Sequence, residues 1–214
     1  MILTPVAAHK MGTTLAALAR GMTDPTARRA LRRIAAASAD RARGAVAASH
    51  HAAALRLARS LGMGTRPGPP RSGFGWDGRA LRTGTEAYVL LHEVAHYQLA
   101  GPGRRRLAEF GLGPGPETGA RDDALRHQTV HSMAREREEA MASLLGILWE
   151  VALGQPALAS FLDQNWLEGA GAARHFEATF GRLRAGRFVT GAGWPTRRVV
   201  GYETRLIIDI NYLS

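Results

Sequence analysis

His92, Glu93 and His96 form an H-E-x-x-H pattern inside the mostly apolar segment 86–100. On a helix, residues four positions apart lie one above the other on the same face, so the two imidazoles can converge on a single metal ion. Glu93 would then lie beside the metal without being a ligand, where its carboxylate can transfer a proton. The pattern predicts half of a metal site, with His92 and His96 as ligands and Glu93 as the catalytic residue.

A metal site with two histidines needs a third protein ligand, and a carboxylate at the start of a second apolar helix is a natural donor. We expect this second helix over residues 132–151. Glu139 is the best candidate, because Ser143 and Gly146 lie on its side of the helix and are small enough to allow a close approach to the first helix. Glu136 lies on the same side, as an additional ligand or as a residue that supports the ligands.

Three other side chains could contribute to the site or to the helix that carries Glu139. His127 and His131 stand four positions apart and offer an alternative third ligand, although ordinary surface histidines are the default interpretation. Glu138 is expected only to favour the N-terminus of its helix electrostatically.

Cysteine is absent from the 214 residues, which excludes disulfides, thiolate ligands and a cysteine nucleophile. A metal must therefore be held by histidine and carboxylate, which suit Fe(II) or Zn(II). No run approaches 18 consecutive apolar residues, and the first 20 residues lack the hydrophobic core and cleavage site of a signal peptide. We therefore expect a cytoplasmic protein with no membrane partner.

The helix that carries the histidines has signals at both ends. Thr83 and Glu86 have the spacing of a capping box, and Gly101-Pro102 should end the helix. An arginine triplet follows directly and could bind an anionic substrate at the mouth of the site, although exposed loop arginines are the commoner case. The candidate substrate-binding residues are Tyr97, Arg104, Arg105 and Arg106.

The net charge of +10 is concentrated near the N-terminus, where residues 1–60 hold ten basic groups against Asp24 and Asp40. Such a surface attracts nucleic acid or an acidic protein. A merely solvated face is the alternative, because Lys10 is the only lysine among many arginines and alanines, which points to coding bias.

Composition divides the chain into three segments: a basic, Ala/Arg-rich helical region over 1–61, a Gly/Pro-rich loop over 62–82 and a metal-binding core over 83–214. Asp24-Pro25 should begin a helix that runs to Ser60, with a break at Gly44.

The core should hold one further helix around Phe176 and Phe180, and a strand over 205–212. The predicted fold is predominantly α, or α+β with a small β-sheet, in which the H-E-x-x-H helix packs on the glutamate-bearing helix.

Two stretches of the chain resemble the bacterial elongation factor P hydroxylases. The first combines His92-Glu93-Val94-Ala95-His96-Tyr97 with Ala100-Gly101 and with Arg104-Arg105-Arg106-Leu107-Ala108-Glu109-Phe110-Gly111. The second runs from Glu136-Arg137-Glu138-Glu139 through Val151-Ala152-Leu153-Gly154-Gln155-Pro156 to Leu167-Glu168-Gly169. The resemblance covers roughly residues 85–170, and residues 1–80 have no counterpart in the family.

This resemblance implies a zincin-like fold with non-haem iron, and hydroxylation of a modified lysine on elongation factor P. Carried over by position, it implies His92, His96 and Glu139 as iron ligands, with Glu93 and Glu136 as further acidic groups near the metal. Two histidines and one carboxylate leave open positions on Fe(II) for dioxygen. An acidic protein substrate would also suit the basic surface by electrostatic steering.

Two other functions stay open. With Zn(II), the same residues predict a gluzincin-type metallopeptidase, in which Glu93 takes a proton from activated water that attacks a peptide carbonyl. This reaction needs an oxyanion donor, for which the candidates are Tyr97, His127 and His131. Alternatively, a non-catalytic module would bind RNA or an acidic protein through residues 20–60, with steep salt dependence.

Overall fold

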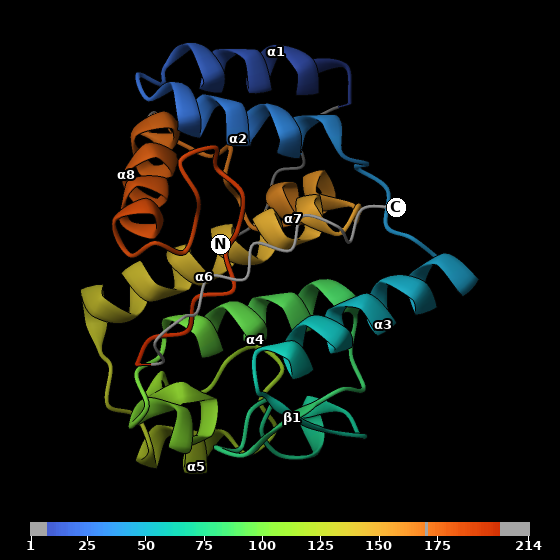
Figure 1. The fold of residues 1–214 in the computed structure, drawn as a ribbon, viewed down its shortest axis with the longest axis vertical. Helices are drawn as coiled ribbons and strands as arrows, with labels where there is room; N and C mark the ends of the chain where they lie inside the picture. Colours follow the sequence, from blue (N-terminus) through green and yellow to red (C-terminus); the bar gives the residue numbers. More distant parts are fainter. Residues whose placement is uncertain (1–7, 170, 202–214) are drawn as a thin grey trace.

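A computed structural model describes residues 8–169 and 171–201 of the chain. Within these ranges the fold is predominantly α with a small β-sheet, as the sequence predicts (Figure 1). The helices are α1 (Ala8–Arg20), α2 (Pro25–Ala36), α3 (Gly44–Ser60), α4 (Ala87–Leu99), α5 (Arg121–Arg126), α6 (Ser132–Ala152), α7 (Ala157–Asp163) and α8 (Ala172–Ala185). Strands β1 (Gly64–Arg66) and β2 (Ala80–Arg82) pair in parallel, and single 3₁₀ turns lie at Pro70–Ser72, Arg104–Arg106 and Ala108–Gly111.

Helices α4 and α6 pack against each other at the centre of the molecule (Figure 1). Glu139 of α6 lies beside His96, whereas Gly146 lies against His92, so the two helices run antiparallel. A Cβ atom on Gly146 would lie 3.3 Å from the backbone N and Cα of His92. The missing side chain at Gly146 therefore allows the close approach that the sequence predicts.

The end of α4 agrees with the sequence prediction, whereas the capping at its start does not. The helix ends at Leu99, just before Gly101-Pro102, as predicted. Its start does not use the expected capping box, because Glu86 is the N-cap residue but makes no side-chain capping hydrogen bond. The hydroxyl of Thr83 donates instead to the carbonyl of Arg66, which extends the β1–β2 pairing. A tertiary hydrogen bond has replaced the local one.

Gln98 fixes the rotation of α4 about its axis. The side chain is fully buried, and its Nε2 donates to the carbonyl oxygens of Thr196 and Arg198, each at 2.8 Å. Its Oε1 accepts a hydrogen bond of 2.8 Å from the indole of Trp149 on α6. These bonds join α4, α6 and the segment that follows α8, and they hold the histidine face of α4 in one orientation.

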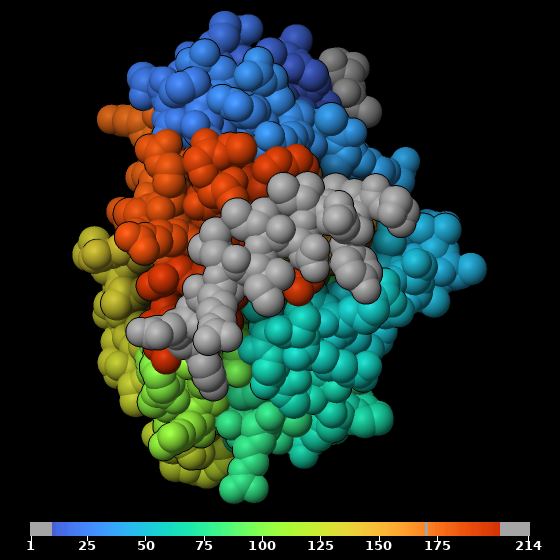
Figure 2. Space-filling model, viewed as in Figure 1, coloured from blue at the N-terminus to red at the C-terminus, as the bar shows by residue number. Residues whose placement is uncertain are grey.

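The predicted N-terminal helix is divided more widely than expected. Asp24 caps α2 as predicted, since its carboxylate accepts from the backbone N of Thr26 at 2.8 Å. The interruption, however, spans residues 37–43 before α3 begins at Gly44. Helix α2 packs on α6, α7 and α8, and α3 packs on α4, so both contribute to one hydrophobic core that extends from Leu18 to Val199. In the space-filling view, α1 and α2 cover one end of the molecule (Figure 2).

The segment 62–82 is less irregular than its glycine and proline content suggests, because it contains β1 and β2. Gly64 is needed in β1, since a Cβ there would lie 2.4 Å from the carbonyl oxygen of Arg79. Phe176 and Phe180 are buried on α8, as predicted. The predicted strand over 205–212 lies outside the described residues. Among the described helices, none combines the length and apolarity needed to cross a membrane.

Candidate metal centre

His92, His96 and Glu139 converge at the interface of α4 and α6. The two Nε2 atoms lie 3.0 Å apart, and Oε2 of Glu139 lies 3.5 Å from Nε2 of His92 and 3.3 Å from Nε2 of His96. Among the described residues, these three form the group of histidine and acidic side chains that could hold a metal ion. The structure brings together the three ligands that the sequence predicts.

The spacing of the three donor atoms fits one metal ion. Zinc or iron bonds to histidine and carboxylate are about 2.1 Å long, and ligand angles between about 90° and 110° place the donor atoms roughly 3.0–3.4 Å apart. The observed separations of 3.0, 3.3 and 3.5 Å lie close to this range. A single ion could therefore bind all three donors with little movement of either helix.

The site is buried on one side and open on the other. The side chain of His96 is 5% exposed, whereas those of His92 and Glu139 are 28% and 40% exposed. A substrate could therefore reach a bound ion from the side of His92 and Glu139.

A proton is held strongly between His96 and Glu139. Burial disfavours both charges, but the attraction between the imidazolium and the carboxylate outweighs it, raising the pKa of His96 to about 10 and lowering that of Glu139 well below its usual range. The pKa of His92 is lowered, chiefly by burial. Protons and a metal ion would compete for these donors, because the ligating forms are neutral imidazole and carboxylate.

Glu138 lies next to the site, although the sequence suggested only an effect on the helix terminus. Its Oε1 is 3.7 Å from Nδ1 of His96, and its carboxylate accepts two hydrogen bonds, of 2.8 and 2.7 Å, from one guanidinium nitrogen of Arg104. The periodicity of α6 carries a signal for this position, because Glu138 precedes the buried Ala142 and Leu145 by four and seven residues. A metal-binding histidine commonly has such a carboxylate on its other nitrogen.

Glu109 is a second acidic residue that the sequence analysis did not assign. A Cβ on Gly75 would lie 3.4 Å from Oε2 of Glu109 and 3.9 Å from Cδ of Glu93, so both carboxyl groups lie beside Gly75. Burial and the nearby Glu109 raise the pKa of Glu93 to about 8. Glu109 itself is held by the backbone N of Gly75 and the hydroxyl of Thr118, each at 2.8 Å. Without a metal ion, Glu93 is therefore easier to protonate than an ordinary carboxylate.

Backbone strain places Glu109 and Phe110. Their φ angles are 48° and 53°, in the left-handed region that non-glycine residues rarely adopt. The conformation turns Glu109 toward Gly75 and stacks the ring of Phe110 on His96, with the ring centroids 5.8 Å apart. Strained backbone of this kind is concentrated at functional sites, where the surrounding structure stabilises it.

Several predicted site residues lie elsewhere. Glu136 and His131 are exposed at the start of α6, outside the ligand group. His127 is also exposed, and its Nδ1 lies 2.8 Å from the carbonyl oxygen of Asp123. Neither histidine replaces Glu139 as the third ligand in this structure.

The predicted substrate-binding residues are mostly used by the fold. Arg105 is buried and donates to the carbonyl oxygens of Ala100 and Val200, so its side chain supports the fold here, and a role in substrate binding stays a prediction. Tyr97 is buried against Trp76. Arg104 is engaged by Glu138, and Arg106 is exposed.

No family model, curated protein or solved structure matches the chain. The resemblance to the elongation factor P hydroxylases, and the function that it implies, therefore stay predictions.

Proposed function

We propose that this protein is a metal-dependent hydroxylase, in which His92, His96 and Glu139 hold Fe(II) and the substrate is a protein side chain. The observation that carries the proposal is the convergence of two imidazole nitrogens and one carboxylate oxygen from two packed helices, at separations that suit one ion. Two histidines and one carboxylate are the ligand set of the non-haem Fe(II) oxygenases.

The surroundings of the site support a hydroxylase over a peptidase. A zinc peptidase needs a hydrogen-bond donor for the oxyanion that forms from the peptide carbonyl. Of the sequence-based candidates, Tyr97 is buried with its hydroxyl 3.4 Å from the carbonyl oxygen of Gly62, and His127 lies against Asp123. His131 is exposed at the start of α6, outside the ligand group.

In hydroxylation, a C–H bond is replaced by C–O–H. The second oxygen atom of dioxygen leaves as water, which requires two electrons from an external reductant and two protons. Bound Fe(II) would supply the coordination positions and the redox chemistry for this step. Glu138 lies 3.7 Å from Nδ1 of His96, and the ring of Phe110 stacks on the imidazole. Glu93 could transfer a proton in this step, and the nearby Glu109 raises the pKa of Glu93.

The resemblance supplies the proposed substrate, a modified lysine on elongation factor P, and with it a cytoplasmic location. An acidic protein would be attracted by the basic N-terminal helices. Arg29 and Arg32 are exposed on α2, while Arg28 and Arg33 donate to the carbonyl oxygens of Met22 and Ala192. Attraction of an acidic protein would therefore come mainly from exposed arginines such as Arg29 and Arg32.

The decisive test is the intact mass of fully modified elongation factor P after incubation with this protein, Fe(II) and ascorbate in air. We expect a gain of one oxygen atom. His92→Ala and Glu139→Ala should abolish the gain, whereas Glu136→Ala should retain it. An unchanged mass with an iron-loaded protein would remove the proposed substrate, and failure to bind iron would remove the hydroxylase itself.

The zinc peptidase is the second candidate, because Glu93 occupies the position of the general base in an H-E-x-x-H peptidase. Incubation of the zinc-loaded protein with an unstructured protein such as casein separates the two functions. Cleavage that disappears in Glu93→Gln, with zinc still bound, would favour the peptidase. Binding of RNA that survives the same substitution and removal of metal would favour the non-catalytic module.

A further inference from the structure

A large cavity of about 1040 Å³ lies away from the metal donors. Glu86, Ala87 and Tyr88 at the start of α4 line it, as does Glu150 near the end of α6. Because α4 and α6 run antiparallel, the cavity lies at the other end of the helix pair from Glu139. Its volume is sufficient for a small organic ligand.

The charged side chains that line this cavity are mainly acidic, whereas the protein as a whole is basic. They are the carboxylates Glu86, Glu117, Glu150 and Asp163, and the guanidinium groups Arg41 and Arg71. Both arginines are already paired, Arg41 with Asp163 at 2.7 Å and Arg71 with Glu117 at 3.2 Å. With four carboxylates and two guanidinium groups, the lining of the cavity is acidic, although the chain has a net charge of +10.

Glu150 is a buried carboxylate with one unused oxygen. The residue is 1% exposed. Its Oε1 accepts a 2.8 Å hydrogen bond from Ser160 and lies 3.6 Å from Arg41, but Oε2 has no hydrogen-bond partner in the described part of the chain. A buried acceptor without a donor is costly, so the residue would gain from a ligand that brings an N–H group.

Arg41 shows that this environment stabilises a cation. Its guanidinium lies 3.8 Å from the centre of the Tyr88 ring and donates to Ser160 at 2.8 Å. Aromatic faces and buried carboxylates together are a common setting for alkylammonium groups. Glu150 lines the same cavity as Arg41 and Tyr88, and its Oε2 accepts no hydrogen bond from Arg41.

We propose that the cavity binds the primary ammonium group of an aliphatic amine, with Glu150 as the buried anchor and Glu86 as a second, exposed carboxylate. The ligand is either a free polyamine or the side chain of a lysine, since both carry the same group. The site does not depend on the proposed hydroxylase activity, because none of the metal donors lines the cavity.

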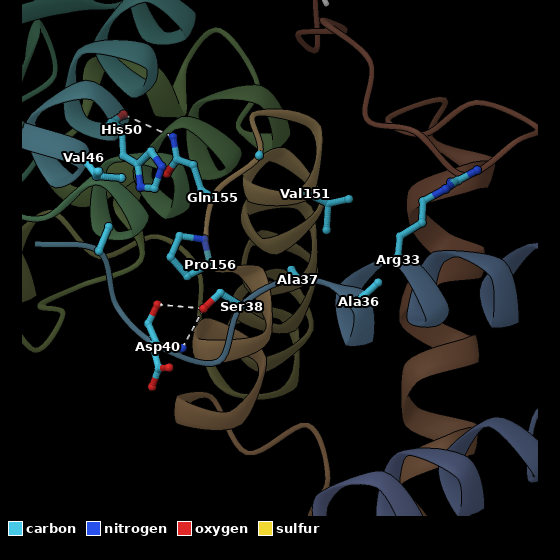
Figure 3. A pocket seen from close by; sticks show the side chains of 12 residues that line it. Arg33, Ala36, Ala37, Ser38, Asp40, Val46, His50, Val151, Gln155 and Pro156 are labelled. Carbon is cyan, nitrogen blue, oxygen red and sulfur yellow. Dashed lines mark hydrogen bonds between the residues drawn. The ribbon is translucent and has the colours of Figure 1, made fainter.

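An adjoining cavity of about 560 Å³ is distinguished by its lining (Figure 3). It shares Ala42, His50, Gln155 and Pro156 with the larger cavity. The side chain of Gln155 donates to the carbonyl oxygen of His50. Much of its lining is aliphatic, including Val46 and Val151. It contains no carboxylate comparable to Glu150, so the ammonium group is assigned to the larger cavity.

Isothermal titration calorimetry of the full chain at pH 8 tests the proposal, with spermidine and Nα-acetyl-lysine amide as separate probes. Binding of spermidine alone indicates a free polyamine, and binding of the lysine derivative indicates a side chain. Glu150→Gln should weaken binding by about tenfold or more, because a hydrogen bond to a charged group is lost. Asp122→Asn, an exposed carboxylate outside the cavity, and His92→Ala should bind as the wild type does.

Proton release gives a second readout. The pKa of Glu150 is raised to about 7 by burial, which outweighs Ser160 and Arg41 and is reinforced by Asp163. An ammonium group beside Oε2 should lower that pKa, so binding at pH 7 should release a proton, measurable as a heat that depends on the buffer. If Glu150→Gln does not fold, Glu86→Gln decides, with an expected loss of several-fold. No binding of either probe, or equal binding to wild type and variants, would overturn the proposal.

Discussion

Oε1 of Glu138 lies 3.7 Å from Nδ1 of His96, the ring nitrogen that does not face Glu139. Arg104 holds the Glu138 carboxylate through two hydrogen bonds, so this carboxylate has little freedom to turn away. The imidazole therefore lies between two glutamates that are adjacent in the sequence of α6. One of them is the predicted ligand, and the other faces the second ring nitrogen, which has no hydrogen-bond partner among the described residues.

Replacing Glu138 by glutamine should weaken metal binding about 10- to 100-fold, the usual effect of losing the carboxylate behind a ligating histidine. The affinity can be measured by competition with a chromophoric chelator. Glu136→Gln is the matched control on the same helix and should leave the affinity unchanged. Equal affinities for Glu138→Gln and the wild type would show that the 3.7 Å contact does not orient His96.

Metal affinity should rise with pH. The pKa of His96 is raised to about 10, because its proton is attracted by Glu139, so His96 stays protonated throughout the range from pH 6 to 8 without metal. Metal binding must then release this proton, and the association constant should increase about tenfold for each pH unit. The measurement is a Zn(II) titration at several pH values, and a constant affinity would contradict the proton competition.

Gly146→Ala should destabilise the protein by about 1–2 kcal/mol, because the new methyl group would press on the backbone of Leu91 and His92. It should also weaken metal binding by separating α4 from α6. Gly181→Ala on α8 is the control, since a Cβ there meets nothing within 4 Å, and it should stabilise the helix by up to about 1 kcal/mol. Urea unfolding of both variants checks this, and equal effects would refute the packing argument.

Glu150 should make stability depend on pH. Its pKa is raised from 4.5 to about 7 by burial, so the folded state binds a proton that the unfolded state has lost between these values. Stability should therefore fall as pH rises from about 4.5 to 7, by about 3 kcal/mol in total from this group. Glu150→Gln should remove this part of the pH dependence. The measurement is the difference in free energy of unfolding between wild type and variant at each pH. A difference that stays constant with pH would contradict the raised pKa of Glu150.

Helical periodicity was sufficient to predict that His92, His96 and Glu139 converge and that the two helices pack closely at Gly146. His92, His96 and Glu139 lie on continuous helices, where spacing alone decides which side chains share a face. The start of α2 at Asp24-Pro25 was predictable for the same reason, because a cap and a proline act within one turn.

The parts that the sequence analysis missed depend on distant segments. Glu109 meets Gly75 across 34 positions and needs a left-handed backbone that no local pattern specifies. Thr83 has the spacing of a capping residue, but the pairing of β1 and β2 takes its hydroxyl. The sequence suggested that Arg105 lies on an exposed loop, but its side chain is buried and donates to the carbonyl oxygens of Ala100 and Val200.

Because the three donors come from two helices separated by a long loop, an ion bound to them would act as a removable crosslink. It would shorten the effective loop between positions 96 and 139 and would bind the folded chain alone. Each tenfold rise of free metal above the dissociation constant would then add about 1.4 kcal/mol to the free energy of unfolding. The lifetime of the protein in a cell would accordingly follow the supply of the metal, quite apart from catalysis.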